Sequence, residues 1–166
     1  VAHLSELISE KTGGNPFFME MFLKSLYEER LIDFDHHAGI WKWDMEEIGV
    51  VEATDNVVDF LANHLRKLPE NERTILAYAA CIGNRFSIGP LSFVSNKSRE
   101  ETAKMLSEAC VQGFISPLSD TWKLIGLSED GGSAAWRFVH DRIQQAAYTL
   151  IPSDLRGRTH RRIGEM

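Results

Sequence analysis

Hydrophobic residues recur at helical spacing along most of this chain, which predicts a mainly α-helical protein. The pattern predicts a first helix that ends at Gly13 and Gly14, and later helices over 88–94 and 98–112. The apolar positions that carry the other helical patterns are Leu4, Leu7 and Ile8; Phe17, Phe18, Met21, Phe22, Leu23, Leu26 and Tyr27; Val57, Leu61, Leu65 and Leu68; Ile75, Leu76, Ala79, Ala80 and Ile82; and Val139, Ile143, Ala147 and Leu150. The second set covers more than one helix face, so we expect that helix to be buried between neighbours.

Alternation with a period of two predicts two short β-hairpins. In the first, Ile32 and Phe34 share a face, as do Trp41 and Trp43, on either side of a polar turn. In the second, Phe114, Ile115 and Leu118 pair with the sequence "SAAWRFV". Two segments are less defined: we expect 45–55 to be an acidic linker with a short turn, and 120–133 to carry a strand of its own or a disordered tip. The order of helix, short helix, helix and two-stranded ribbon is typical of a winged helix-turn-helix.

A glycine-rich elbow interrupts the helical pattern at "TGGNPFFMEMFLKSL". Asn15 is a good N-cap and Pro16 suits the first position of a helix, so a second helix is expected to begin immediately after the glycines.

This elbow closely resembles the GxP-type segment of STAND NTPases, the signal-transduction branch of AAA+ P-loop ATPases. The later stretches "LPENERTILAYAACIGNRF" and "WRFVHDRIQQAAYTLIP" are similar to the winged-helix portion of the same family. The sequence of these stretches is most similar to the ATPase modules of bacterial multidomain signalling kinases. In those proteins a Ser/Thr kinase domain precedes the ATPase and a sensor histidine kinase can follow. The resemblance covers nearly the whole chain.

The resemblance implies a mainly α fold with small β hairpins: a helical lid subdomain, a winged-helix domain and the start of a helical arm. The corresponding boundaries are 1–50 for the lid with its hairpin, 51–139 for the winged-helix-like domain and 140–166 for a helical connector to a following repeat region. The implied function is regulatory and non-catalytic, namely closure over ADP or ATP and transmission of the nucleotide state to other domains.

By the same resemblance, three residues of the elbow would bind the nucleotide base. Pro16 would contact adenine, because a proline locked at a helix start is a rigid apolar edge, while Gly14 and Asn15 would shape the approach. The alternative is that these residues form only a capping elbow between two helices.

A second implied site residue is His140, in the sequence "FVHDR". In related proteins a His-Asp pair at this position reaches the bound diphosphate and holds the ADP-loaded state. An imidazole N–H can donate to a phosphate oxygen, and Asp141 could cap and orient the helix. The alternative is that Asp141 caps the helix and His140 only packs.

Composition narrows the functional classes. The formal net charge is −6 with a pI near 5.5, which speaks against nucleic acid as the default partner. The last thirty residues are different, since six arginines face three carboxylates there. The two cysteines, Cys81 and Cys110, are read as buried free thiols. No signal peptide or membrane span is recognisable, so a cytoplasmic location without a membrane partner is expected.

The chain has no GxxxxGK[ST] motif and no acidic strand end to hold magnesium, so it is expected not to be an enzyme on its own. ATP or ADP would be the cofactor of a longer ATPase or protein kinase, with none expected for this segment alone. The implied partners are an upstream P-loop ATPase core and downstream helical-repeat or kinase domains of the same polypeptide.

Two other functional classes fit the sequence less well. A DNA-binding or protein-interaction module of a transcriptional regulator is the main alternative, but the helix "SREETAKMLSEACVQ" has two basic and three acidic residues and would be repelled by a duplex. A metal-dependent phosphohydrolase built on His140 and Asp141 would need further converging ligands, and none is expected at metal-ligand spacing.

Overall fold

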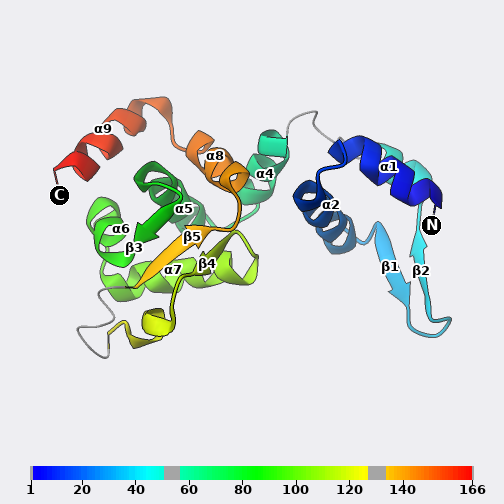
Figure 1. The fold of residues 1–166 in the computed structure, drawn as a ribbon, viewed down its shortest axis with the longest axis horizontal. Coiled ribbons are helices and arrows are strands. Elements are labelled where there is room, and N and C mark those ends of the chain that lie inside the picture. Colours follow the sequence, from blue (N-terminus) through cyan, green and yellow to red (C-terminus); the bar gives the residue numbers. More distant parts are fainter. Residues whose placement is uncertain (1, 51–56, 127–133, 166) are drawn as a thin grey trace. The chain divides into compact units, whose positions relative to one another are not determined.

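A computed structural model of the chain describes residues 2–50, 57–126 and 134–165. It divides into two compact units, an N-terminal unit (Val1–Phe60) and a C-terminal unit (Leu61–Met166), which are described separately (Figure 1). The fold is mainly helical with two small antiparallel sheets, as the hydrophobic pattern predicts. The functional boundaries expected at 50/51 and 139/140 stay predictions.

Two helices and an elbow open the N-terminal unit. Helix α1 (Ala2–Thr12) ends at two glycines, and Gly13 and Gly14 both have positive φ, 59° and 69°. Helix α2 (Pro16–Glu28) then begins with Asn15 as its N-cap and proline at its first position. Both capping predictions are confirmed.

A β-hairpin and a short helix follow α2. Strands β1 (Ile32–Asp35) and β2 (Ile40–Trp43) pair so that Phe34 lies opposite Trp41. The Asp35 carboxylate accepts hydrogen bonds from two backbone N–H groups of the turn and pairs with Lys42 at 2.6 Å. The segment expected to be a linker instead forms α3 (Met45–Val50), because Asp44 accepts from the N–H groups of the first helical turn. Residues 51–56 lie outside the described residues.

The core of the N-terminal unit is aromatic. Phe18, Phe22 and Phe60 form a cluster with ring centroids 5.0–6.3 Å apart, and Phe22 is fully buried. The prediction that α2 is buried between neighbours holds for only part of the helix, since Leu23 and Tyr27 remain 40% and 55% exposed. The helix therefore has one buried face and one apolar face that is open.

Helix α5 (Glu70–Ile82) is the centre of the C-terminal unit. It packs against α6 (Ile88–Ser95), α7 (Arg99–Val111), α8 (Asp141–Thr149) and α9 (Ser153–Gly164). Helix α4 (Val57–Arg66) precedes it and contains the boundary between the units. Small side chains such as Ala79 and Ala80, both buried, let the neighbouring helices approach α5 closely.

The start of α7 shows why these helices begin where the sequence indicates. The Ser98 side chain accepts from the N–H of Glu101, whose carboxylate accepts from the N–H of Ser98. This reciprocal capping box satisfies two N–H groups that the helix itself cannot pair.

A three-stranded sheet completes the C-terminal unit, and its order β3-β5-β4 differs from the two-stranded ribbon that was predicted. Strands β4 (Ile115–Pro117) and β5 (Ala135–Phe138) pair as expected, but β3 (Arg85–Ser87) pairs with the other edge of β5. The short "NRF" stretch showed no alternation long enough to indicate a strand. A 3₁₀ helix, η1 (Asp120–Leu124), occupies the first part of the insert. Residues 127–133 lie outside the described residues.

No helix in the described part of the chain combines the length and the apolar character needed to cross a membrane.

The buried and exposed faces of α2 give a test of the N-terminal core. Phe22→Ala should lower the free energy of unfolding by about 3–5 kcal/mol, because it leaves a cavity among the three phenylalanines. Tyr27→Ala, on the exposed face of the same helix, should cost much less. Urea unfolding followed by tryptophan fluorescence measures both; equal losses would contradict the packing described here.

Candidate functional site

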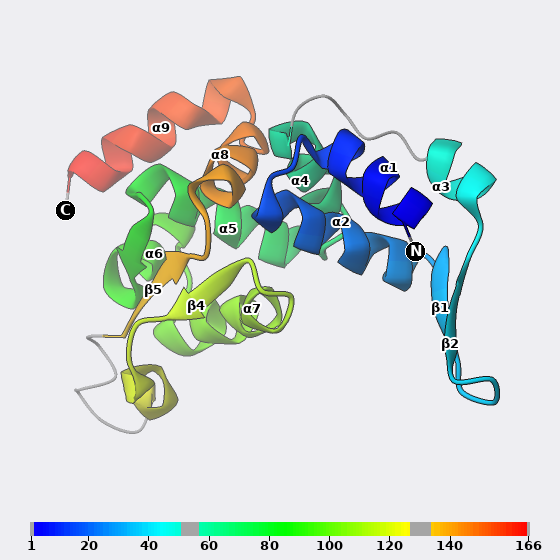
Figure 2. The ribbon, with the colours of Figure 1, turned by 45° about the vertical axis from the view of Figure 1, so that its right-hand side comes forward.

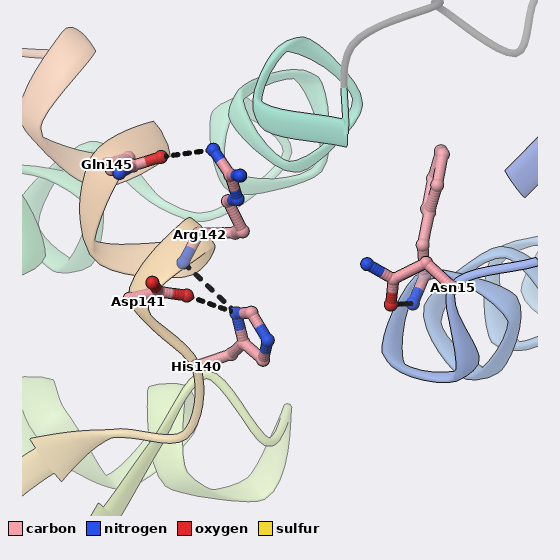
Figure 3. Close-up of polar contacts among 6 residues, drawn as sticks. Asn15, His140, Asp141, Arg142 and Gln145 are labelled. Atoms are coloured by element: carbon pink, nitrogen blue, oxygen red, sulfur yellow. Dashed lines mark hydrogen bonds and ion pairs between the residues drawn. The ribbon is translucent and has the colours of Figure 1, made fainter. Parts of the chain in front are cut away.

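The elbow residues Gly14, Asn15 and Pro16 are all exposed to solvent. Asn15 is in an extended conformation, and its Oδ1 accepts a hydrogen bond of 3.2 Å from the N–H of Phe18, so its side chain folds back over the start of α2 (Figure 3). A Cβ added to Gly14 would meet nothing within 4 Å. Glycine is therefore favoured at this position by its positive φ and not by lack of space.

His140 lies where strand β5 gives way to helix α8 (Figure 3). Its backbone is extended, with φ −143° and ψ 147°, and its Nδ1 accepts from the N–H of Arg142 at 3.2 Å. The prediction that Asp141 caps this helix is wrong, because His140 is the N-cap and Asp141 is the first helical residue. The sequence does not predict a histidine cap, because the preferred capping residues are Ser, Thr, Asp and Asn.

The same Nδ1 also lies 2.7 Å from Oδ1 of Asp141, and the two contacts exclude each other. Without a proton, Nδ1 can accept from the Arg142 N–H. With a proton, it can only donate, and the Asp141 carboxylate becomes its partner. In either state Nδ1 is used within the chain, so a contact with a ligand would fall to Nε2.

Arg142 places a cationic residue in the first turn of α8, in addition to the residues predicted for the site. Its guanidinium donates to Oε1 of Gln145 at 3.0 Å, one turn further along α8, and the side chain is exposed (Figure 3). The sequence "HDR" contained the signal, since a cation two residues after an expected phosphate ligand lies near the same helix N-terminus. The imidazole and the helix N-terminus favour an anion here, whereas the Asp141 carboxylate opposes one and the Arg142 guanidinium points away from the ring, toward Gln145 (Figure 3).

The four predicted site residues thus divide between the units. Gly14, Asn15 and Pro16 belong to the N-terminal unit, and His140 belongs to the C-terminal unit. Both groups lie at helix starts. Their joint contact with one nucleotide stays a prediction.

The histidines and cysteines of the described residues do not form a metal centre. No group of three or more His, Cys, Asp or Glu side chains in these parts of the chain could hold a metal ion. His64 is buried with its ring against Phe114, and His36 packs edge-on against Phe34. Cys81 is buried and Cys110 half-buried, both are free thiols, and burial raises the pKa of each.

Comparison with known proteins identifies one informative relative. No protein-family model matches the chain, and no solved structure matches it. The chain is similar to the hybrid signal transduction histidine kinase G of Dictyostelium discoideum, with 31% identity over 188 aligned residues. The alignment covers 98% of this chain but only 6% of the relative's length. This similarity supports a role in signalling.

One carboxylate of the C-terminal unit is held in an unfavourable environment. Glu72 of α5 faces α7 across a groove of about 470 Å³, and its Oε2 is buried without a hydrogen-bond partner among the described residues. Burial, and secondly the negative charge of Glu108, raise the pKa of Glu72 above its ordinary value of 4.5. Lys104 and Glu101 also line the groove.

The sign of this shift predicts a pH dependence. A carboxyl whose pKa is raised on folding stabilises the fold at pH values below its unfolded pKa, and this contribution is lost as pH rises through the folded pKa. Glu72→Gln should therefore raise Tm by a few degrees at neutral pH, with the difference vanishing below about pH 4.5. The exposed Glu70→Gln is the matched control. Thermal unfolding across this range that shows no gain for Glu72→Gln would contradict the assignment.

Proposed function

We propose that this chain is the nucleotide-sensing lid and winged-helix portion of a STAND-type ATPase within a signalling kinase. It would close over ADP or ATP bound by another part of the polypeptide and pass the nucleotide state to kinase or helical-repeat domains. The similarity to a signal transduction histidine kinase along almost the whole chain supports the signalling role. The local geometry at two helix starts supports nucleotide contact.

The observation that carries the proposal is the position of His140. It is half-buried at the N-terminus of α8, where the helix dipole favours a negative charge, and Arg142 lies in the same helical turn. A diphosphate at this position would receive a charge-assisted hydrogen bond from the imidazole.

The elbow would supply the contact with the base. Pro16 is exposed at the first position of α2, with its φ locked by the ring and its conformation fixed further by the Asn15 cap. Open space around Gly14 leaves room for a planar group to approach. Because this apolar edge is rigid, the protein would lose little conformational entropy when an adenine binds against it.

Exchange of the nucleotide would then act as a switch. Contacts made by His140 with the diphosphate of ADP favour a closed state, and a nucleotide that weakens them shifts the population toward an open state. Helices α5, α6 and α7 with the sheet β3-β5-β4 have the order of a winged helix, the module that would carry this movement. Hydrolysis would be the work of a P-loop core elsewhere in the polypeptide, so a GxxxxGK[ST] motif should be encoded upstream of Val1.

The isolated chain should bind ADP only weakly. Most phosphate contacts would come from the P-loop, so isothermal titration should give a dissociation constant above about 100 μM. AMP titrated in parallel shows how much the second phosphate contributes. Micromolar affinity of this chain for ADP would mean that it holds a complete site, contrary to the proposal.

In the full-length protein, His140→Asn separates phosphate contact from helix capping. Asparagine can still cap α8 but lacks the imidazole, so thermal stability should be nearly unchanged while ADP dissociates about tenfold faster. His140→Ala removes both functions and should also lose about 1 kcal/mol of stability. Stopped-flow release of a fluorescent ADP analogue measures the rate. An unchanged rate in both variants would exclude His140 from the site.

A further inference from the structure

Helix α9 forms a groove with α5 and α6 on the C-terminal unit, and the sites proposed above do not use it. Two neighbouring hollows of about 250 and 120 Å³ share Tyr78 and Leu155 in their walls, and together they are here called the α9 groove. Figure 2 shows α9 running past α6, and α9 packs against both α5 and α6.

One end of the α9 groove is basic. Arg158 and Arg162, one helical turn apart, line the smaller hollow. Arg162 lies over the ring of Phe93 at 5.2 Å, which fixes its guanidinium beside the groove. Within the described parts of the chain, no carboxylate lies within salt-bridge distance of either arginine. At the far end, Glu70 and Arg73 provide charges of both signs.

Arg156, in the first turn of α9, has a different role. Arg156 donates to the carbonyls of Ile151 and Thr149 at the end of α8 and stacks over Tyr148 at 5.1 Å. It holds the α8–α9 corner and is not available to a partner. Arg158 and Arg162 differ from Arg156, because holding the α8–α9 corner does not account for their charges.

The walls between these charged ends are apolar. Tyr78 is half-buried and Val94 is buried, while Leu155 is 36% exposed and the neighbouring Phe93 is 48% exposed. An apolar surface next to two uncompensated guanidinium groups suits a ligand that brings both apolar and carboxylate side chains.

We propose that the α9 groove docks an acidic amphipathic peptide segment of a protein partner. Apolar residues of that segment would cover Tyr78 and Leu155, and its carboxylates would pair with Arg158 and Arg162. Nucleic acid fits less well, because the chain carries a net charge of −6 and phosphate groups gain no favourable contact from apolar walls. The inference does not depend on nucleotide binding.

Fluorescence anisotropy of the whole chain with a labelled helical peptide of leucine and glutamate tests the proposal. We expect a dissociation constant in the range of about 10–100 μM. Arg158→Glu with Arg162→Glu should weaken binding at least about tenfold. Leu155→Ser, which leaves all charges in place, should weaken it about threefold or more. Absence of binding up to about 1 mM would overturn the proposal.

Matched controls separate docking from general charge attraction. Arg99→Glu with Lys104→Glu changes the net charge of the same unit equally on α7 and should leave binding within about twofold. The same peptide with lysine in place of glutamate should not bind. Binding that ignores Leu155→Ser, or a duplex DNA that binds as tightly as the peptide, would overturn the proposal. Self-association of the chain abolished by the arginine changes would assign the groove to a second copy and also overturn it.

Discussion

The N–H groups at the start of each helix need partners, and this constraint organises the parts of the chain most relevant to function. Asn15, Asp44, Ser98 and His140 each meet it with a side-chain acceptor. In this way the caps determine where α2, α3, α7 and α8 begin. The elbow and the strand-to-helix junction are therefore well-defined structures even without a ligand. Any nucleotide contact has to be made with the groups that capping leaves over.

Because helix capping uses some polar atoms of His140 and Asn15, the proposed nucleotide contacts are assigned to other atoms of the two sites. At His140, Nδ1 serves the helix, so the proposed phosphate contact is assigned to Nε2. At the elbow, Oδ1 of Asn15 serves the helix, so the proline ring offers the remaining contact surface. A residue type that caps a helix less well than serine or aspartate is understandable at position 140 if its ring has this second task.

The sequence predicted those features that depend on local chemistry. The glycine pair, the Asn15 cap and the first hairpin follow from residue types at fixed spacing, and the structure contains all of them. It missed features that depend on tertiary partners. Strand β3 has only three residues and exists because β5 lies beside it, and α3 required Asp44 to cap an acidic stretch. The exposed Tyr27 shows that an apolar pattern does not say which face finds a neighbour. Nucleotide contact cannot be read from capping geometry alone, since the same residues satisfy the helix first.

The order β3-β5-β4 has a consequence for synthesis of the protein. The central strand is the last of the three to be translated, so Arg85–Ser87 and Ile115–Pro117 have no partner until Phe138 has left the ribosome. The N-terminal unit carries its own aromatic core, formed by Phe18, Phe22 and Phe60. The nascent chain is therefore expected to complete its first unit while the second still waits for its middle strand, with two unpaired edges open to chaperones.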